Sequence, residues 1–260
     1  MKRTLGALAC AAGLLMAAGA SAAAKPTVVL VHGAFADASS WNGVTRILEH
    51  DGYTVVAAAN PLRGVASDGA YVANILASLK TPVVLVGHSY GGNVISAAAG
   101  DAGNVKALVY VAAFAPEAGE SAADLAGKFP GSTLGAALTP VPRTDGTTDL
   151  YIARDRFHEQ FAADVPEAVT ARMAVTQRPA TQEALSEPSG DDPLWRHVPS
   201  WFVFGEEDRN IPAALEHDMA RRAGAHRTIE IPGASHAVPV AHPAATARLI
   251  AEAATVRAVA

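Results

Sequence analysis

Short apolar, β-branched runs recur along the chain, and segments with apolar residues at helical spacing lie between them. The runs predict strands at residues 27–31, 54–58, 81–86, 105–112, 201–204 and 228–231. The intervening spacing predicts helices at residues 41–50, 71–79, 92–99, 212–223 and 243–259. Such alternation is typical of an α/β fold, with a mainly parallel sheet of about six strands and helices on both faces.

This rhythm stops between about residues 117 and 199. The stretch holds many Pro, Gly and Thr residues, and its helical patterns at residues 151–161 and 166–173 are broken. A long insertion of this kind inside a regular α/β domain usually forms a functional lid. We therefore expect a helical cap on a single domain that spans residues 23–260.

The first 22 residues have the pattern of a secretory signal peptide. Lys2 and Arg3 give a positive start, residues 5–18 are apolar, and Ala-Ser-Ala at residues 20–22 supplies a cleavage site. The apolar run is too short for a membrane span. We therefore expect an exported protein, periplasmic or secreted; a retained N-terminal anchor helix is the alternative.

Charge and cysteine content exclude several classes of partner. The formal net charge is −5, or −7 without the leader, and no block of Lys or Arg occurs, which argues against nucleic-acid binding. No segment after the leader is long and apolar enough to span a membrane. The only cysteine, Cys10, lies in the leader, so the mature domain would have no disulfide. No His, Asp or Cys pair has the spacing of metal ligands.

The most informative motif is Gly-His-Ser-Tyr-Gly at residues 87–91. An apolar strand precedes it and a helix follows it, which is the context of a nucleophile elbow. In such a turn a strained backbone holds one serine out of the sheet, and glycines avoid collisions with neighbouring elements. We therefore predict that Ser89 is a nucleophile. We expect His88 to be structural, because its side chain should point away.

A serine hydroxyl needs a base that takes its proton and an acid that orients this base. Asp208 follows the strand at residues 201–204, and His236 follows the strand at residues 228–231. Because parallel strands end at one edge of a sheet, both loops should reach Ser89 there. We predict Asp208 as the acid and His236 as the base.

Neighbouring residues leave alternatives for the acid. Glu206 and Glu207 adjoin Asp208 and could carry that role instead. The remaining histidines are assigned to packing, to solvent or to a helix start: His32, His217, His226 and His242.

The negative oxygen that develops on an attacked carbonyl requires two hydrogen-bond donors. We expect one to be the backbone N–H of Tyr90, which follows the nucleophile. The other should be the Ala34 N–H, in the His-Gly-Ala-Phe loop at residues 32–35. An ordinary strand-end turn is the alternative for this loop.

Together these segments resemble the α/β-hydrolase superfamily, and within it the small branch of plant methylesterases, hydroxynitrile lyases and related bacterial esterases. The resemblance is carried by residues 29–34, Trp41, residues 83–92 and residues 235–236. It implies an α/β-hydrolase fold with a helical cap, a serine esterase mechanism and no cofactor. It also supports Ser89, Asp208 and His236 as a catalytic triad.

Two positions depart from the hydroxynitrile lyases of this branch. Those enzymes place a lysine after the catalytic histidine and a threonine in the loop after the first strand, where this chain has Ala237 and Gly33. The departures favour ester hydrolysis over cyanohydrin cleavage. We therefore expect a carboxylesterase, and the apolar, alanine-rich cap predicts a small hydrophobic ester as its substrate. Phe157 and Phe161 could line the pocket, with ordinary cap core as the alternative.

Two further classes of function stay open. The same triad could serve a cofactor-free lyase, a perhydrolase or an acyltransferase. A protein of this shape could also bind a ligand without catalysis, because fold does not dictate function.

Overall fold

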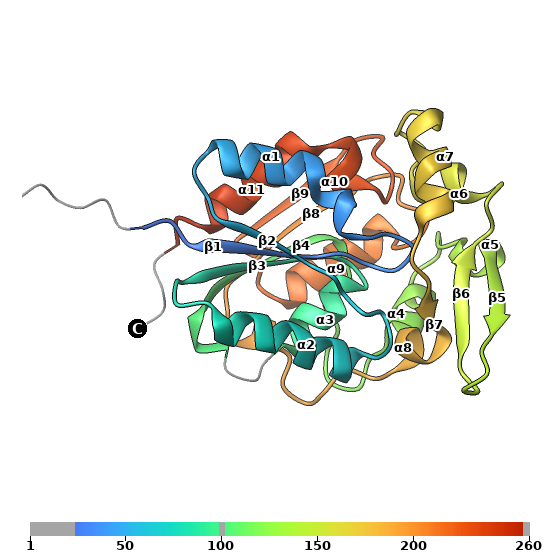
Figure 1. Ribbon diagram of the computed structural model, residues 1–260, viewed down its shortest axis with the longest axis horizontal. Coiled ribbons are helices and arrows are strands. Elements are labelled where there is room, and N and C mark those ends of the chain that lie inside the picture. The colour runs from blue at the N-terminus through green and yellow to red at the C-terminus, as the bar shows by residue number, and fades with distance from the viewer. Residues whose placement is uncertain (1–23, 99–101, 257–260) are drawn as a thin grey trace, which may run out of the picture.

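A six-stranded sheet forms the centre of the computed structural model, which describes residues 24–98 and 102–256 (Figure 1). Its strands are β1 (Thr27–Val31), β2 (Val55–Ala58), β3 (Val83–Ser89), β4 (Val105–Ala113), β8 (Ser200–Gly205) and β9 (Arg227–Ile231). All neighbouring pairs are parallel, in the order β2-β1-β3-β4-β8-β9. The predicted α/β class and the six predicted strands are therefore confirmed.

Helices cover both faces of this sheet. α1 (Asn42–His50), α10 (Val238–Ala241) and α11 (Pro243–Ala253) pack together on one face, and α2 (Val65–Ser78) and α3 (Gly91–Ala97) on the other (Figure 1). α9 (Ala213–Arg222) packs against β8 and β9. The central strands β1 and β3 are buried along their whole length, as their continuous apolar sequences require.

One helix, α2, begins earlier than predicted, at a point where a polar residue interrupts the apolar pattern. α2 begins at Val65, six residues before the predicted start, because Asp68 is buried rather than solvated. Its carboxylate accepts hydrogen bonds from the Arg63 backbone N–H at 3.1 Å and from the Tyr90 hydroxyl at 3.0 Å. These partners satisfy the hydrogen bonds of the buried Asp68 carboxylate, which lies in the first turn of α2.

The segment between β4 and β8 forms a cap beyond the carboxyl ends of the strands, at the right of Figure 1. Its helices are α4 (Ala122–Lys128), α5 (Leu134–Ala137), α6 (Phe157–Phe161), α7 (Glu167–Thr176) and α8 (Gln182–Ser186). It also contains a three-stranded antiparallel sheet of β5 (Leu138–Pro142), β6 (Thr148–Ile152) and β7 (Ala180–Thr181), which the sequence analysis did not anticipate. The first part of the expected helix at 151–161 belongs to this sheet, because a turn at Gly146, with φ +88°, closes a hairpin there.

Short 3₁₀ helices complete the described chain: η1 (Ala38–Trp41), η2 (Ala102–Asn104) and η3 (Leu194–Arg196). The expected signal peptide at residues 1–22 and the end of the expected last helix, residues 257–259, lie outside the described residues. Within the ranges described, no helix combines the length and the hydrophobicity that a membrane crossing requires.

The turn from β3 into α3 depends on very close backbone packing. A β-carbon at Gly92 would lie 2.1 Å from the Phe114 carbonyl oxygen, and one at Gly91 would lie 2.5 Å from the Val31 carbonyl oxygen. Both obstacles are backbone atoms of the sheet, which cannot move aside without breaking strand pairing. Only glycine fits at these two positions.

We expect Gly92→Ala to lower the free energy of unfolding by about 1–3 kcal/mol, because the added methyl group overpacks this contact. The matched control is Gly127→Ala in α4, where an added β-carbon meets nothing within 4 Å. The control should leave stability unchanged or raise it by up to about 1 kcal/mol, since alanine favours a helix. Urea unfolding followed by circular dichroism measures both, and equal stabilities of the two variants would contradict the packing argument.

Candidate active site

Ser89 is the last residue of β3 and adopts a left-handed backbone conformation, with φ +54°. A non-glycine residue in this region is strained and persists only where the surrounding structure fixes it. A β-carbon at Gly33 would lie 2.5 Å from the Ser89 β-carbon, so the loop after β1 passes directly beside the serine. The strained strand-to-helix turn that the motif predicts is therefore present, and Ser89 is 7% exposed.

Asp208 and His236 form a buried hydrogen-bonded pair. Nδ1 of His236 lies 2.6 Å from Oδ2 of Asp208, and neither side chain is exposed. The other carboxylate oxygen of Asp208 accepts the backbone N–H groups of Asn210 at 2.7 Å and Ile211 at 2.9 Å. These three donors stabilise the charged carboxylate.

This pairing fixes the chemistry of the His236 ring. With Asp208 ionised, Nδ1 carries the proton that it donates, so Nε2 of a neutral ring is free to accept one. Nε2 is buried and has no hydrogen-bond partner in the described part of the chain. Among those residues, no hydrogen bond joins it to the Ser89 hydroxyl. A general base needs this arrangement, in which one buried ring nitrogen contacts an acid and the other is open.

The loop that carries His236 packs against the elbow through His88. Nε2 of His88 lies 3.1 Å from the backbone oxygen of His236, and the two rings are 4.8 Å apart between centroids. Burial lowers the pKa of His88 well below its ordinary value, and nearby His236 adds to this effect. His88 is therefore neutral and can donate through Nε2, in direct contact with His236 rather than pointing away from the site as expected.

The other sequence candidates lie elsewhere. Glu206 and Glu207 are exposed, and Glu206 accepts the backbone N–H of Gly233 at 3.0 Å. Of the three neighbouring acids, only Asp208 contacts His236. His32 is fully buried against the backbone oxygen of Gly33, and burial lowers its pKa, in keeping with a packing role.

Two backbone amides near Ser89 are free to donate. Within the residues that the structure describes, neither the Ala34 N–H nor the Tyr90 N–H donates to a protein acceptor. The next amide along, that of Phe35, is occupied by the Arg178 carbonyl oxygen at 2.9 Å. The side chain of Tyr90 is anchored by its hydroxyl to Asp68, which fixes the position of its amide.

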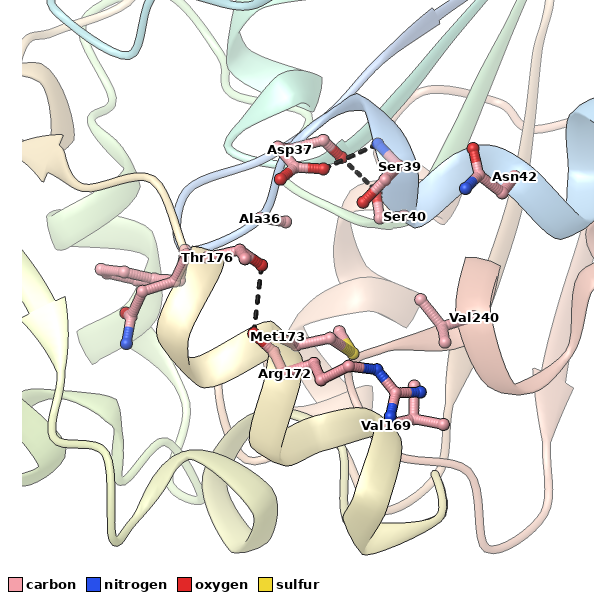
Figure 2. Close-up of a pocket in the computed structure, with 12 residues that line it drawn as sticks. Ala36, Asp37, Ser39, Ser40, Asn42, Val169, Arg172, Met173, Thr176 and Val240 are labelled. Carbon is pink, nitrogen blue, oxygen red and sulfur yellow. Dashed lines mark hydrogen bonds between the residues drawn. The ribbon is translucent and has the colours of Figure 1, made fainter.

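A cleft of about 280 Å³ lies between cap helix α7 and the core, next to the loop that contains Ala34 (Figure 2). Figure 2 shows Asp37, Ser39 and Ser40 on the core side, and Arg172 and Met173 on α7. Phe35, the neighbour of Ala34, also lines the cleft. The lining is therefore mixed, with both polar and apolar groups. Over the described residues, no group of three or more His, Cys, Asp or Glu side chains has a metal-binding arrangement.

Comparison with known proteins agrees with the fold. The model of the Alpha/beta hydrolase family matches residues 28–249. The chain is 26% identical over 248 residues to putative methylesterase 11, chloroplastic, of Arabidopsis thaliana, which covers 86% of this chain. It spans 63% of the length of that protein. It is also 25% identical over 240 residues to an alpha-hydroxynitrile lyase of Arabidopsis thaliana, covering 84% of this chain and 93% of the lyase.

Among solved structures, polyneuridine aldehyde esterase superposes with a TM-score of 0.74. The two sequences are 18% identical, and the match covers 88% of this chain and 98% of the esterase. At this level of identity, the likeness shows the fold alone.

Glu216 on α9 is a buried acid that sequence reasoning missed. Its side chain is fully buried, and neither carboxyl oxygen makes a hydrogen bond of normal geometry in the described ranges. Burial, reinforced by the charge of Asp208, raises its pKa well above the model-peptide value of 4.5, and the nearby Ala113 amide offsets this only in part. The helical spacing of α9 places position 216 on the face toward the sheet, and this spacing is the sequence signal that identifies Glu216 as buried.

Because its folded pKa is raised, Glu216 makes stability fall as pH rises above about 4.5 toward the folded pKa, since the folded state binds the proton more tightly. We expect Glu216→Gln to flatten this decline, by up to about 1.4 kcal/mol per pH unit. Urea unfolding between pH 5 and 8 measures the slope. The control, Glu49→Gln on the exposed face of α1, should run parallel to wild type. A Glu216→Gln slope equal to wild type would contradict the argument.

Proposed function

Because the chain belongs to the alpha/beta hydrolase family, we propose that it is a serine hydrolase that cleaves a small carboxylic ester through an acyl-enzyme. The observation that carries this proposal is the buried Asp208–His236 hydrogen bond beside the strained turn at Ser89. The esterase and methylesterase relatives support the same reaction class.

In the proposed mechanism, Ser89 Oγ attacks the ester carbonyl and its proton passes to Nε2 of His236. Asp208 stabilises the imidazolium that forms. The Ala34 and Tyr90 amides hold the oxyanion. Collapse of this intermediate expels the alcohol, which takes the proton from His236. Water, activated by His236, then attacks the acyl-enzyme and releases the acid and the free serine.

The mechanism requires a hydrogen bond between Ser89 and His236. This bond must form when substrate binds. Catalytic hydrogen bonds of this kind often tighten only in the substrate complex. We propose that the Ser89 hydroxyl turns toward the unpartnered Nε2 of His236 when substrate binds. The cleft between α7 and the core is lined by Phe35, the neighbour of Ala34, and its volume suits a short ester.

A lyase reaction on the same residues is the second candidate, favoured by the similarity to alpha-hydroxynitrile lyase. The geometry at Gly33 favours hydrolysis over the lyase reaction. Any side chain there would meet the Ser89 β-carbon at 2.5 Å, so the threonine of the lyases in this branch does not fit this loop. Product analysis with ester and cyanohydrin substrates separates the two reactions.

We also propose that the chain is exported through residues 1–22 to the periplasm or the medium. This rests on the positive start, the apolar run and the Ala-Ser-Ala site of the leader.

Ser89→Ala should abolish turnover of a chromogenic short-chain ester, because it removes the hydroxyl that attacks the ester carbonyl. The fold should be kept, since alanine fits the same backbone. Ser78→Ala, on the exposed end of α2, is the matched control and should retain wild-type activity. Turnover by Ser89→Ala at the wild-type rate would refute the proposal.

Asp208→Asn should lower kcat by about three to four orders of magnitude, because the amide no longer holds His236 in the productive tautomer. Glu207→Gln tests the alternative acid and should leave kcat unchanged, since Glu207 is exposed and does not contact His236. Steady-state kinetics on the same ester measures both. A large loss in Glu207→Gln with a small loss in Asp208→Asn would reverse the assignment of the acid.

A further inference from the structure

The cap holds the loop of His236 through one carboxylate. Asp164 lies between α6 and α7, 71 residues before Ser235 in the chain and 78 before His242. The Ser235 hydroxyl donates to Oδ1 of Asp164, and Nε2 of His242 lies 2.9 Å from Oδ2. One cap side chain therefore uses both of its oxygens on two residues of the core.

The positions of these two partners give the contact its significance. Ser235 immediately precedes His236, and His242 is the last residue before α11. Between them lie His236 and the short helix α10. Asp164 thus binds both ends of the segment that carries the proposed base.

The same part of the cap also contacts the base itself. The Phe161 ring lies 5.0 Å from the His236 ring between centroids, at an angle of 76°, and Phe161 is buried. Phe161 is therefore a neighbour of His236. Aromatic edge contacts of this geometry restrict how a ring can turn.

The contact is only partly shielded from water. The Asp164 side chain is 19% exposed and that of His242 is 33% exposed, while Ser235 is buried. Partly buried, charge-assisted hydrogen bonds hold their geometry better than exposed ion pairs. Asp164 is absent from the lining of the cleft between α7 and the core.

We propose that Asp164 is a positioning residue that ties the cap to the His236 loop and holds His236 in the orientation for proton transfer. This rests on the proposed function of Ser89, Asp208 and His236. Asp164 acts through Ser235 and His242 and touches neither substrate nor the reacting atoms. Its loss should therefore slow the chemical step more than it weakens substrate binding.

Three variants test this. Asp164→Ala removes both contacts and should lower kcat about tenfold or more while KM changes less than about twofold, since small displacements of a catalytic group are costly. Asp164→Asn should restore kcat to within about threefold of wild type, because its amide oxygen accepts from Ser235 and its N–H donates to a neutral imidazole. Asp192→Ala is the matched control: Asp192 pairs with His197 at 2.7 Å near the end of the cap segment, and its loss should leave kcat unchanged.

The rate at which a serine-directed phosphonate labels Ser89, followed by mass spectrometry, separates the two proposals. Failure of the wild type to react would overturn the serine hydrolase assignment itself. A reactive wild type with Asp164→Ala reacting equally fast, or Asp164→Ala raising KM with kcat intact, would overturn only the role of Asp164. An Asp164→Asn variant with a kcat as low as that of Asp164→Ala would also overturn the role of Asp164.

If Asp164→Ala does not fold, Ser235→Ala carries the test together with Asp164→Asn. Ser235→Ala removes one of the two anchors and should lower kcat several-fold, with a thermal midpoint close to wild type. A wild-type kcat in Ser235→Ala would then overturn the proposal.

Discussion

The backbone at Ser89 is forced into a left-handed conformation by segments that approach it more closely than side chains would allow. Gly33 touches the serine from the loop after β1, and Gly91 and Gly92 lie against the backbone of β1 and the end of β4. Strain of this kind is retained only when the surrounding packing fixes it. The position of the nucleophile, and with it the free amides beside it, therefore depends on the parallel strands that flank β3.

Low polarity at this edge of the sheet decides which groups carry charge. Three donors bind the carboxylate of Asp208. Glu216, which has no comparable set of donors, has a raised pKa, and the buried imidazoles of His32 and His88 have lowered ones. Each buried group is thus either paired or held neutral, as the cost of an isolated buried charge requires. Negative charge is concentrated beside His236, where an imidazolium would form.

The cap takes part in this arrangement rather than only covering it. Phe161 packs on the ring of His236, and Asp164 binds the residues at either end of its loop. Core and cap therefore meet at the proposed base. His236 is not among the residues that line the cleft between α7 and the core.

The sequence by itself determined the six parallel strands, the turn at Ser89 and the loops that carry Asp208 and His236. These follow from local signals, because a buried strand needs a continuous apolar run and the turn needs glycine at fixed offsets. It left the acid open among Glu206, Glu207 and Asp208, which share one loop. Only the tertiary structure shows which of these three acids contacts His236, since the 2.6 Å contact of Asp208 depends on how two loops meet. The tertiary structure also brings His88, Phe161 and Asp164 into contact with the His236 loop. These residues lie 71 to 148 positions away from their partners in the chain, and no local sequence pattern encodes such pairings.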